Sequence, residues 1–585
     1  MMLLVYGSKT KNVSDNLLRR LKETRTPITV IEVDQRVDRA LSYDGAVFHT
    51  FEDYLSERDL EDIDERAAVF SRSWYRVNDK DVTRFDGVSE GAVLELDVFF
   101  RALLIYKNLE CASRIFSMRT ISHIYIGSGV SIVPEAWKLI ARHINIEYTI
   151  LTPDTETEDK IREKSIFPRI IAHLKVLKPE HNPVVNSDSK IILATKEGRS
   201  TCGTWFDSLR KTETICLTPL KPEKSYNTIF RSLVSFFSYN YYIAVHKNAL
   251  RSGNAFTYNG LDIWPLWEPD IKTFFRVLFP LSHLESLSLS AWIKKYRVSG
   301  LITTWHEHRR AFFEVARANG IPYIVLQDSW LPGEHFPSGY RRFMLCDHLL
   351  VWGEISESWS RHIDGVKTHI VGNPQSITLN LKKKDVRTSA NGRPMTILLT
   401  HQCWGPWTAF HSPLDTNDMW ASFAETAKEF PDVGFVGKIH PLVDDVGHEG
   451  PGRSAEIMEW AASLSQKNFE VLPLKSSMQE ALDGSDVVVT YYSLTAIEAL
   501  AKGIPVVMMN LTKKRDLFPE LVDIGGVTAV HSTEDMIRFV DAIKNKSVDE
   551  SISSASMEKI LEKIFARPVD ISSIVLDIFE GCHRH

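Results

Sequence analysis

The chain has 585 residues, 44% of them hydrophobic, and is long enough for two or three domains with separate cores. Its 69 basic residues are balanced by 75 acidic residues, which gives a formal net charge of −6. This balance excludes a general nucleic-acid-binding protein, because such a protein carries a basic domain or stripe. Local basic loops for anionic ligands stay compatible with it.

Cysteine spacing and hydropathy indicate the compartment. The six cysteines are scattered without a CxxC pair, which excludes a disulfide scaffold or zinc ribbon and predicts reduced, mostly buried thiols. The N-terminal MMLLVYGSKTKN lacks the basic start and cleavage site of a signal peptide. The apolar run 233–245 is too short and too polar to span about 30 Å of hydrocarbon. We expect a cytoplasmic protein. Peripheral contact of this run with the inner face of the membrane stays open, and packing in a core is favoured.

Short β-branched runs alternate with helical patterns, which is typical of parallel α/β sheets. The first series has predicted strands at 3–7, 28–33, 123–128 and 148–152. A polar segment with two prolines, 178–189, is a predicted linker. Residues 1–180 are therefore predicted to form a Rossmann-like accessory lobe.

Two further series follow the linker. The strands of the second are KIILAT, TICLTP, GLITTW, YIVLQ and LLVWG, with a helix-rich stretch at about 226–297. After a basic joint at 381–394, the strands of the third are MTILLT, VGFVGKI, FEVLP, DVVVT and PVVMM. The last helical segment is expected to pack back across the lobes. The predicted fold class is α/β, with Rossmann-like lobes at 186–380 and 390–585 and the additional one in front.

Ligands of open parallel sheets bind outside the carboxyl ends of the strands, beside the helices that follow. The strongest such signal is the turn YYSLT, which follows the strand DVVVT and opens a helix. Ser493 and Thr495 favour a helix start, and with the backbone N–H groups around Leu494 they can hold a phosphate. Glu498, one turn later, can accept hydrogen bonds from ribose hydroxyls. The alternative is an ordinary capped helix with a salt-bridging glutamate.

Two other strand ends carry candidate donor-site residues. Lys438 and His440 follow the strand VGFVG two residues apart, and Pro441 stiffens the exit. Together they can neutralise a phosphate that gains charge as its bond to a sugar breaks. The alternative is a surface lysine beside a satisfied core histidine. His401 and Gln402 follow the first strand of the third series, where such a lobe presents a phosphate- or base-binding loop. No GxGxxG is present, which disfavours ordinary dinucleotide binding.

These motifs carry a family resemblance. KIHP, followed about fifty residues later by SLTAIEALAKGIPVV, resembles the donor lobe of GT-B transferases of bacterial surface glycans. The similar families are the polysialyl- and Kdo-transferase-like capsule enzymes and the CDP-glycerol glycerophosphotransferases. Segments 318–330, 347–354 and 369–375 are similar to the run from acceptor lobe to hinge in these families. The similarity covers roughly 298–510.

The resemblance implies a glycosyltransferase without a cofactor, acting in capsule or lipopolysaccharide biosynthesis. Its partners would be a nucleotide-sugar donor, CMP-linked, and a glycan or glycolipid acceptor. In these families the basic-x-His-Pro element and the Ser/Thr-rich turn hold the phosphate of a cytidine nucleotide. Two departures matter. Asp328 and Ser329 stand where relatives have His-Gly after the glutamine, and Thr490 replaces the first glutamate of a pair found in retaining enzymes. The second departure favours an inverting enzyme.

An inverting transfer needs a base on the acceptor lobe. Asp328, at the end of a predicted strand, is the first candidate, and His306 and Glu307 are the next. For Asp328 the alternative is a turn or N-cap residue. The HEH sequence lacks the HExxH spacing and a third ligand, so no essential metal is expected. Two other functions stay open: a UDP-sugar epimerase or hydrolase on the same fold, and a non-catalytic module of a polysaccharide assembly system.

Overall fold

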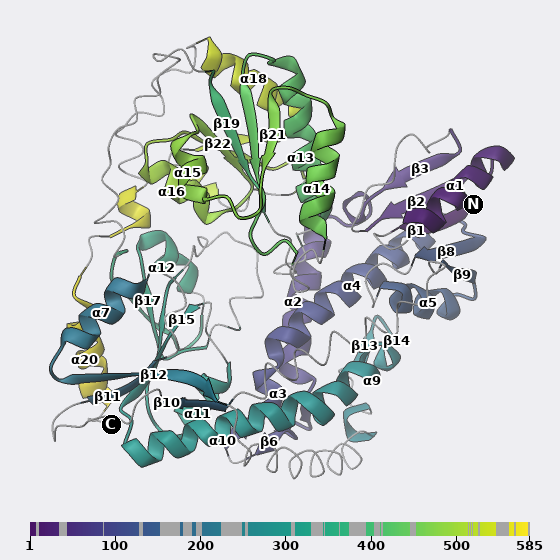
Figure 1. Ribbon diagram of the computed structural model, residues 1–585. Coiled ribbons are helices and arrows are strands. Elements are labelled where there is room, and N and C mark those ends of the chain that lie inside the picture. Colours follow the sequence, from purple (N-terminus) through teal and green to yellow (C-terminus); the bar gives the residue numbers. More distant parts are fainter. Residues whose placement is uncertain are drawn as a thin grey trace.

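The computed structural model has three α/β units, each built around one mainly parallel sheet (Figure 1). The structure describes residues 1–6, 11–33, 44–85, 87–127, 133–151, 176–179, 190–194, 202–223, 248–251, 256–305, 310–328, 343, 345–361, 363–373, 394–402, 410, 413–444, 452–512, 514, 516, 519–523, 527–545, 561–566 and 569–582. The predicted fold class, α/β with three Rossmann-like sheets, is confirmed. Across the described part of the chain, no helix is long and apolar enough to cross a membrane.

The front lobe contains a five-stranded parallel sheet in the order β3-β2-β1-β8-β9. The strands are β1 (Met2–Tyr6), β2 (Ile28–Glu32), β3 (Ala46–His49), β8 (His123–Gly127) and β9 (Glu147–Leu151). The strands predicted at 3–7, 28–33, 123–128 and 148–152 are confirmed, whereas β3 was not predicted. Because β1 and β8 are neighbours, the connections reverse direction between them, as in doubly wound folds.

The middle sheet has the order β10-β12-β11-β15-β16-β17-β18, with only the β10–β12 pair antiparallel. The strands are β10 (Val176–Pro179), β11 (Lys190–Ala194), β12 (Ile215–Glu223), β15 (Gly300–Thr304), β16 (Tyr323–Leu326), β17 (His348–Val351) and β18 (Lys367–Ile370). β15, β16 and β17 are buried along their whole length, which explains their continuous apolar runs. β10 ends within the predicted linker and falls inside the range predicted for the front lobe, yet it pairs in this sheet.

The C-terminal sheet is all parallel, in the order β21-β20-β19-β22-β23-β24. The strands are β19 (Thr396–Thr400), β20 (Gly434–Lys438), β21 (Phe469–Leu472), β22 (Val487–Thr490), β23 (Val506–Met509) and β24 (Val527–Val530). In chain order this is 3-2-1-4-5-6, the order of the dinucleotide-binding folds. The topological switch point therefore lies between β19 and β22, and this sheet is predicted to bind its ligand there.

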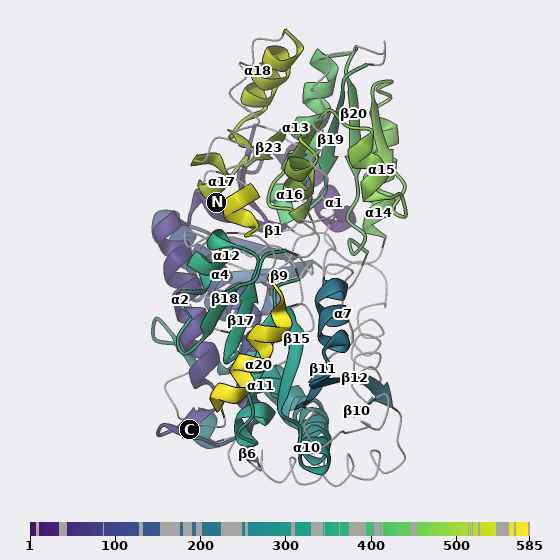
Figure 2. The same ribbon diagram turned by 90° about the vertical axis from the view of Figure 1, so that its left-hand side faces the viewer.

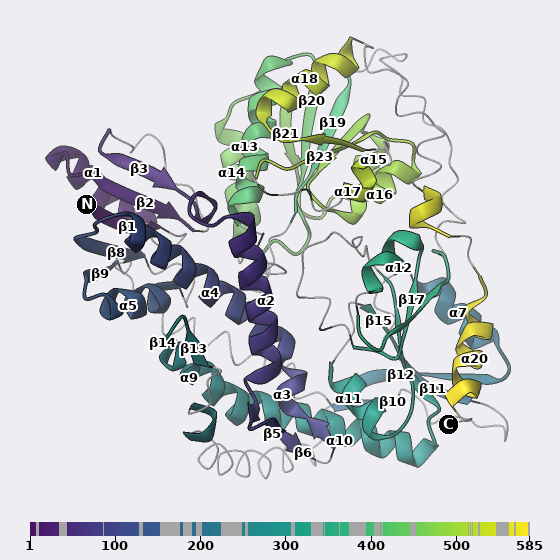
Figure 3. The same ribbon diagram turned by 180° about the vertical axis from the view of Figure 1, so that it is seen from behind.

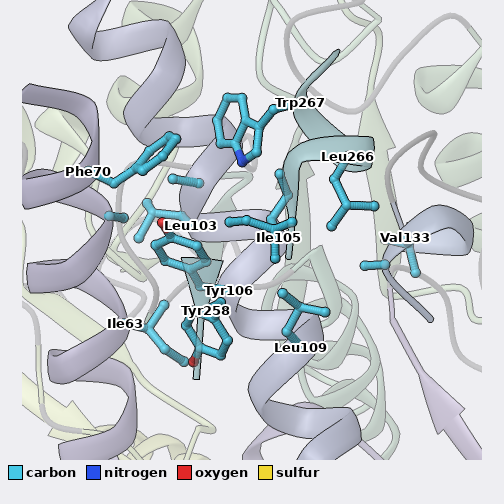
Figure 4. Packing of buried hydrophobic residues seen from close by; sticks show 14 of the residues in the cluster. Ile63, Phe70, Leu103, Ile105, Tyr106, Leu109, Val133, Tyr258, Leu266 and Trp267 are labelled. Carbon is cyan, nitrogen blue, oxygen red and sulfur yellow. The ribbon is translucent and has the colours of Figure 1, made fainter. Parts of the chain in front are cut away.

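The core of the front lobe is rich in aromatic side chains from distant segments (Figure 4). Helix α2 (Glu57–Ser73) packs against α4 (Glu95–Met118). The ring of Phe70 lies 4.8 Å from that of Trp267 in α9 (Trp264–Thr273), and Tyr106 stacks on Tyr258 at 4.8 Å. The hairpin β13–β14 (Thr257–Tyr258, Leu261–Asp262) and α9 thus pack with the front lobe, although they fall inside the range predicted for the middle lobe.

The carboxyl edges of the middle and C-terminal sheets meet. Ile355, in α12 (Glu354–Ser360) after β17, belongs to the apolar core of the C-terminal lobe. Leu494, in α16 (Leu494–Ala501) after β22, packs against apolar cores of both lobes. Figures 1 and 3 show α12 opposite α16 from both sides. Each sheet thus presents the loops after its strands to the other lobe.

The end of the chain returns to the middle lobe, as predicted. The N–H of Ala566 donates to the carbonyl of Trp352 at 2.9 Å, and that of Val569 donates to Val371 at 3.1 Å. Gly353 allows this approach, because an added Cβ would lie 2.4 Å from the carbonyl oxygen of Ile564. Helix α20 (Ile571–Cys582) then packs beside α7 (Gly203–Lys211) (Figure 2).

Candidate functional site

The donor residues predicted from the sequence gather at the switch point of the C-terminal sheet. His401 and Gln402 follow β19, Lys438 ends β20, and Ser493 follows β22 by three residues. The N–H of His401 donates to the carbonyl of Lys438 at 2.9 Å, which joins two of these segments directly. Since β19 pairs with both β20 and β22, three segments up to ninety residues apart meet at one edge.

Lys438 is buried, with 3% of its surface exposed. Its ammonium donates to the carbonyls of Ile439 at 2.8 Å and Leu474 at 3.0 Å. Burial lowers the pKa of Lys438, and within the described ranges no carboxylate is paired with it. The interpretation as a surface lysine does not fit this environment. A buried cation held only by neutral carbonyls has charge available for an anion at the edge of the sheet.

His440 differs from Lys438 because it is partly exposed. The backbone N–H of Leu442 donates to its Nδ1 at 3.2 Å, so the ring proton of the neutral imidazole sits on Nε2. The carbonyl of His440 accepts from Val443 at 3.1 Å, which closes a turn around the exposed Pro441. The imidazole is thus held by its own loop as a hydrogen-bond donor.

His401 and Gln402 offer further polar groups. The indole of Trp420, in α13 (Pro413–Glu429), donates to Nδ1 of the buried His401 at 3.4 Å. Trp420 also packs on Gly437, where an added Cβ would lie 2.2 Å from its ring. Oε1 of Gln402 is buried and, among the residues that the structure describes, accepts no hydrogen bond. Trp420 escaped the sequence analysis, because no feature of its helix indicates that the indole reaches a strand end.

The turn after β22 starts α16 as predicted. The hydroxyl of Ser493 accepts from the N–H of Thr495 at 3.2 Å and donates to its hydroxyl at 3.1 Å. Ser493 is therefore the N-cap, and its carbonyl also accepts from the N–H of Ala496 at 3.0 Å, so two N–H groups of the first turn have partners within the cap. Leu494 contributes its backbone alone, since its side chain packs between the lobes.

Glu498 lies one turn into α16 and is partly buried. Burial raises the pKa of its carboxyl, and the charge of Lys502 opposes this only in part. Lys502 is ion-paired with Asp483 instead. In the described part of the chain, the carboxylate of Glu498 makes no hydrogen bond or ion pair, so the structure does not have the salt bridge of the alternative interpretation. Its carboxylate is available to a ligand.

Lys514 is bound into the fold. Its ammonium lies 3.8 Å from Asp415 Oδ2 and donates to the carbonyl of Phe410, a residue that joins the apolar core of the front lobe. These contacts join the segment after β23 to Phe410 and Asp415, so Lys514 has a structural role.

The acceptor side is described only in part. Asp328 follows β16 by two residues and has 0% of its surface exposed. His306 and Glu307, the other predicted bases, lie outside the described residues, as does the apolar run 233–245. Gln327 is a structural residue: its side chain donates to Ser356 at 2.9 Å and accepts from the N–H of Trp352 at 2.7 Å.

No protein-family model matches the chain, and no curated protein matches it. Among solved structures it is similar to the UDP-GlcNAc 2-epimerase of Methanocaldococcus jannaschii, with 14% identity and a TM-score of 0.39 over 67% of this chain and 100% of that one. The UDP-GlcNAc 2-epimerase of Neisseria meningitidis has 16% identity and a TM-score of 0.37, over 68% and 100%. MurG of Acinetobacter baumannii has 12% identity and a TM-score of 0.36, over 67% and 99%. Similarities at this level transfer no residue role, substrate or reaction to this chain.

Proposed function

We propose that the protein is a glycosyltransferase that moves a sugar from a nucleotide-activated donor to a glycan or glycolipid acceptor. The observation that carries this proposal is the switch point of the C-terminal sheet. There, Lys438 ends β20, and the cap of α16 and Glu498 follow the neighbouring part of the sheet after β22. Among the described residues, Lys438 has only neutral hydrogen-bond partners, and the carboxylate of Glu498 makes no hydrogen bond. Such a set of uncommitted polar groups is typical of a ligand site.

In this proposal the donor phosphate binds between Lys438, His440 and the first turn of α16. The ammonium and the helix N–H groups would stabilise the charge that the nucleotide gains as its bond to the sugar breaks. Nε2–H of His440 would donate to the same phosphate. Glu498 would accept from the ribose hydroxyls, and His401 and Gln402 would contact the base or the first phosphate.

On the acceptor side, we propose that Asp328, His306 or Glu307 takes the proton from the attacking hydroxyl in an inverting, metal-independent transfer. Full burial of Asp328 requires the end of β16 to become accessible before this residue can act. The cytidine donor and the bacterial surface glycan are proposed from KIHP and the SLTAIEAL turn. We also propose that the enzyme acts at the inner face of the cytoplasmic membrane.

Calorimetric titration with CMP, CDP, UDP and GDP tests the site. We expect selective binding of a cytidine nucleotide that weakens in His440→Ala and stays unchanged in His143→Ala, an exposed histidine of the front lobe. Preference for UDP or GDP would contradict the cytidine donor, and binding of no nucleotide would contradict the enzyme. Incubation of a bound nucleotide-sugar without acceptor separates the alternatives, because an epimerase would still convert its sugar.

A further inference from the structure

A polar cavity lies between the front lobe and helix α11 (Arg310–Ala318) of the middle lobe. Its volume is about 340 Å³, at the lower end of the range for small-molecule sites. The front lobe contributes the end of α2, the short strands after it and the start of α4. Five arginines line this cavity, which we call the arginine cavity: Arg72, Arg76, Arg84, Arg310 and Arg317.

Acidic residues compensate the arginine cavity only in part. Two glutamates, Glu95 and Glu314, line it, and Asp81 lies 3.4 Å from Arg84 just outside. Asp347 also interacts electrostatically with Arg317. The five arginines therefore outnumber the two glutamates that line the cavity, and carboxylates around it offset part of their charge. Burial raises the pKa of Glu95, although the charge of Arg310 opposes this shift. The negative charge of Glu95 is therefore disfavoured by its environment.

The side chain of Arg310 lies between two carboxylates of the arginine cavity. It is 14% exposed, and its Nη1 lies 3.1 Å from Glu95 Oε2 while its Nε lies 3.8 Å from Glu314 Oε1. Neither nitrogen makes an aligned hydrogen bond to any described residue, however. The hydroxyl of Tyr75 donates to the other oxygen of Glu95 at 2.6 Å. A largely buried guanidinium whose N–H groups lack acceptors raises the free energy of the folded protein, and an acceptor that enters the cavity would remove this cost.

The arginine cavity opens to solvent on the side of Arg76 and Arg317. Both residues are exposed, and the guanidinium of Arg76 lies 5.6 Å from the centre of the Tyr75 ring. Arg317 follows Arg310 by seven residues, so both lie on one face of α11. An anion can thus approach the exposed arginines first and then reach Arg310.

We propose that the arginine cavity binds the phosphoryl group of a phosphorylated sugar. A phosphate monoester presents three acceptor oxygens, one more than a carboxylate, so it can accept from several arginines at once. Guanidinium groups match these oxygens with paired N–H donors. The volume exceeds that of a bare phosphate and admits part of a sugar.

The identification of the phosphorylated sugar as the acceptor rests on the proposed function. Arg310 begins α11, the helix that follows β15 in the lobe proposed to bind the acceptor. A phosphate on the acceptor would thus be held by this lobe, and the enzyme would select phosphorylated acceptors.

Titration of the full chain with glucose 6-phosphate, glucose and inorganic phosphate tests the inference. We expect glucose 6-phosphate to bind at one site and more tightly than the other two. Its affinity should fall about tenfold or more in the double variant Arg76→Gln/Arg317→Gln and in Arg310→Gln. Arg538→Gln, which removes one charge as Arg310→Gln does but at an exposed position of the C-terminal lobe, should leave it unchanged. The double variant alters only exposed side chains and keeps the test valid if Arg310→Gln fails to fold.

Absence of glucose 6-phosphate binding, or binding that ignores the arginine substitutions, would overturn the inference. So would equal affinity for inorganic phosphate, because free phosphate would then be the ligand. CMP titrated into the same variants gives an independent result. If CMP fails to bind even the unaltered chain, the proposed function fails, while the phosphate titrations still report on the arginine cavity.

Discussion

The carboxyl edges of the middle and C-terminal sheets face each other, yet their polar groups are used in opposite ways. In the middle sheet, the Gln327 side chain is hydrogen-bonded at both ends, to Ser356 and Trp352. In the C-terminal sheet, Lys438 is buried with only neutral partners, and the carboxylate of Glu498 makes no hydrogen bond in the described part of the chain. The polar groups of the first edge stabilise its lobe, whereas we propose that those of the second bind a ligand.

The difference teaches how to separate a structural residue from a functional one when both are buried and polar. A buried group whose hydrogen bonds are all made within the protein changes stability when it is removed. A buried group without such bonds costs free energy in the empty protein, and a ligand that provides the partner recovers it. The two edges should therefore respond differently to substitution.

Gln327→Ala should have the largest effect, and it should be on stability. The substitution leaves the N–H of Trp352 and the hydroxyl of Ser356 buried without their partner, which costs about 2–4 kcal/mol in the free energy of unfolding. Urea unfolding measures this loss. Gln479→Ala, at an exposed site in α15 (Met478–Asp483), should change stability by less than about 0.5 kcal/mol.

Nucleotide affinity of folded Gln327→Ala should equal that of the unaltered chain. A large loss of nucleotide affinity without a loss of stability would reverse the comparison, because the middle edge would then hold the ligand.

The sequence predicted most of the C-terminal edge because its signals are local. β22 is a run of buried β-branched residues, and Ser493 caps the next helix by a hydrogen bond two residues away. β3 and β24 were missed, since both are short and only partly buried. Contacts between distant segments were not predictable either: neither Trp420 on His401 nor Arg310 beside Glu95 has a local pattern.

Lys438→Met should have the next largest effect, on binding of the phosphate. Loss of the ammonium should weaken CMP binding about tenfold to a hundredfold, because a hydrogen bond to a charged group contributes about 1.5–3 kcal/mol. Affinity for cytidine, which lacks the phosphate, should not change. Lys544→Met, which removes an exposed lysine paired with Asp432, is the matched control in calorimetry.

Equal losses for CMP and cytidine would show that Lys438 acts through the fold, by holding the carbonyls of Ile439 and Leu474. The two edges would then no longer differ, because the buried polar groups of both would stabilise the fold.

The smallest effect concerns Glu498 and pH. Burial raises the pKa of its carboxyl in the free protein, whereas ribose hydroxyls that donate to the carboxylate would lower that pKa in the complex. Binding would therefore release a proton, and affinity should fall as pH drops through the raised pKa of the free form. Above that pKa the affinity should be constant. Each pKa unit between the two forms corresponds to about tenfold in affinity.

Titration of cytidine at several pH values removes the ionisation of the phosphate, and comparison with Glu498→Gln removes the ionisation of the cytosine ring. Glu498→Gln cannot release the proton, so its affinity profile should be flatter than that of the unaltered chain. Calorimetry in buffers with different ionisation enthalpies counts the proton directly. A profile that falls equally in Glu498→Gln would assign the titration to another group, which would leave Glu498 a buried acid of α16 and not a ribose ligand.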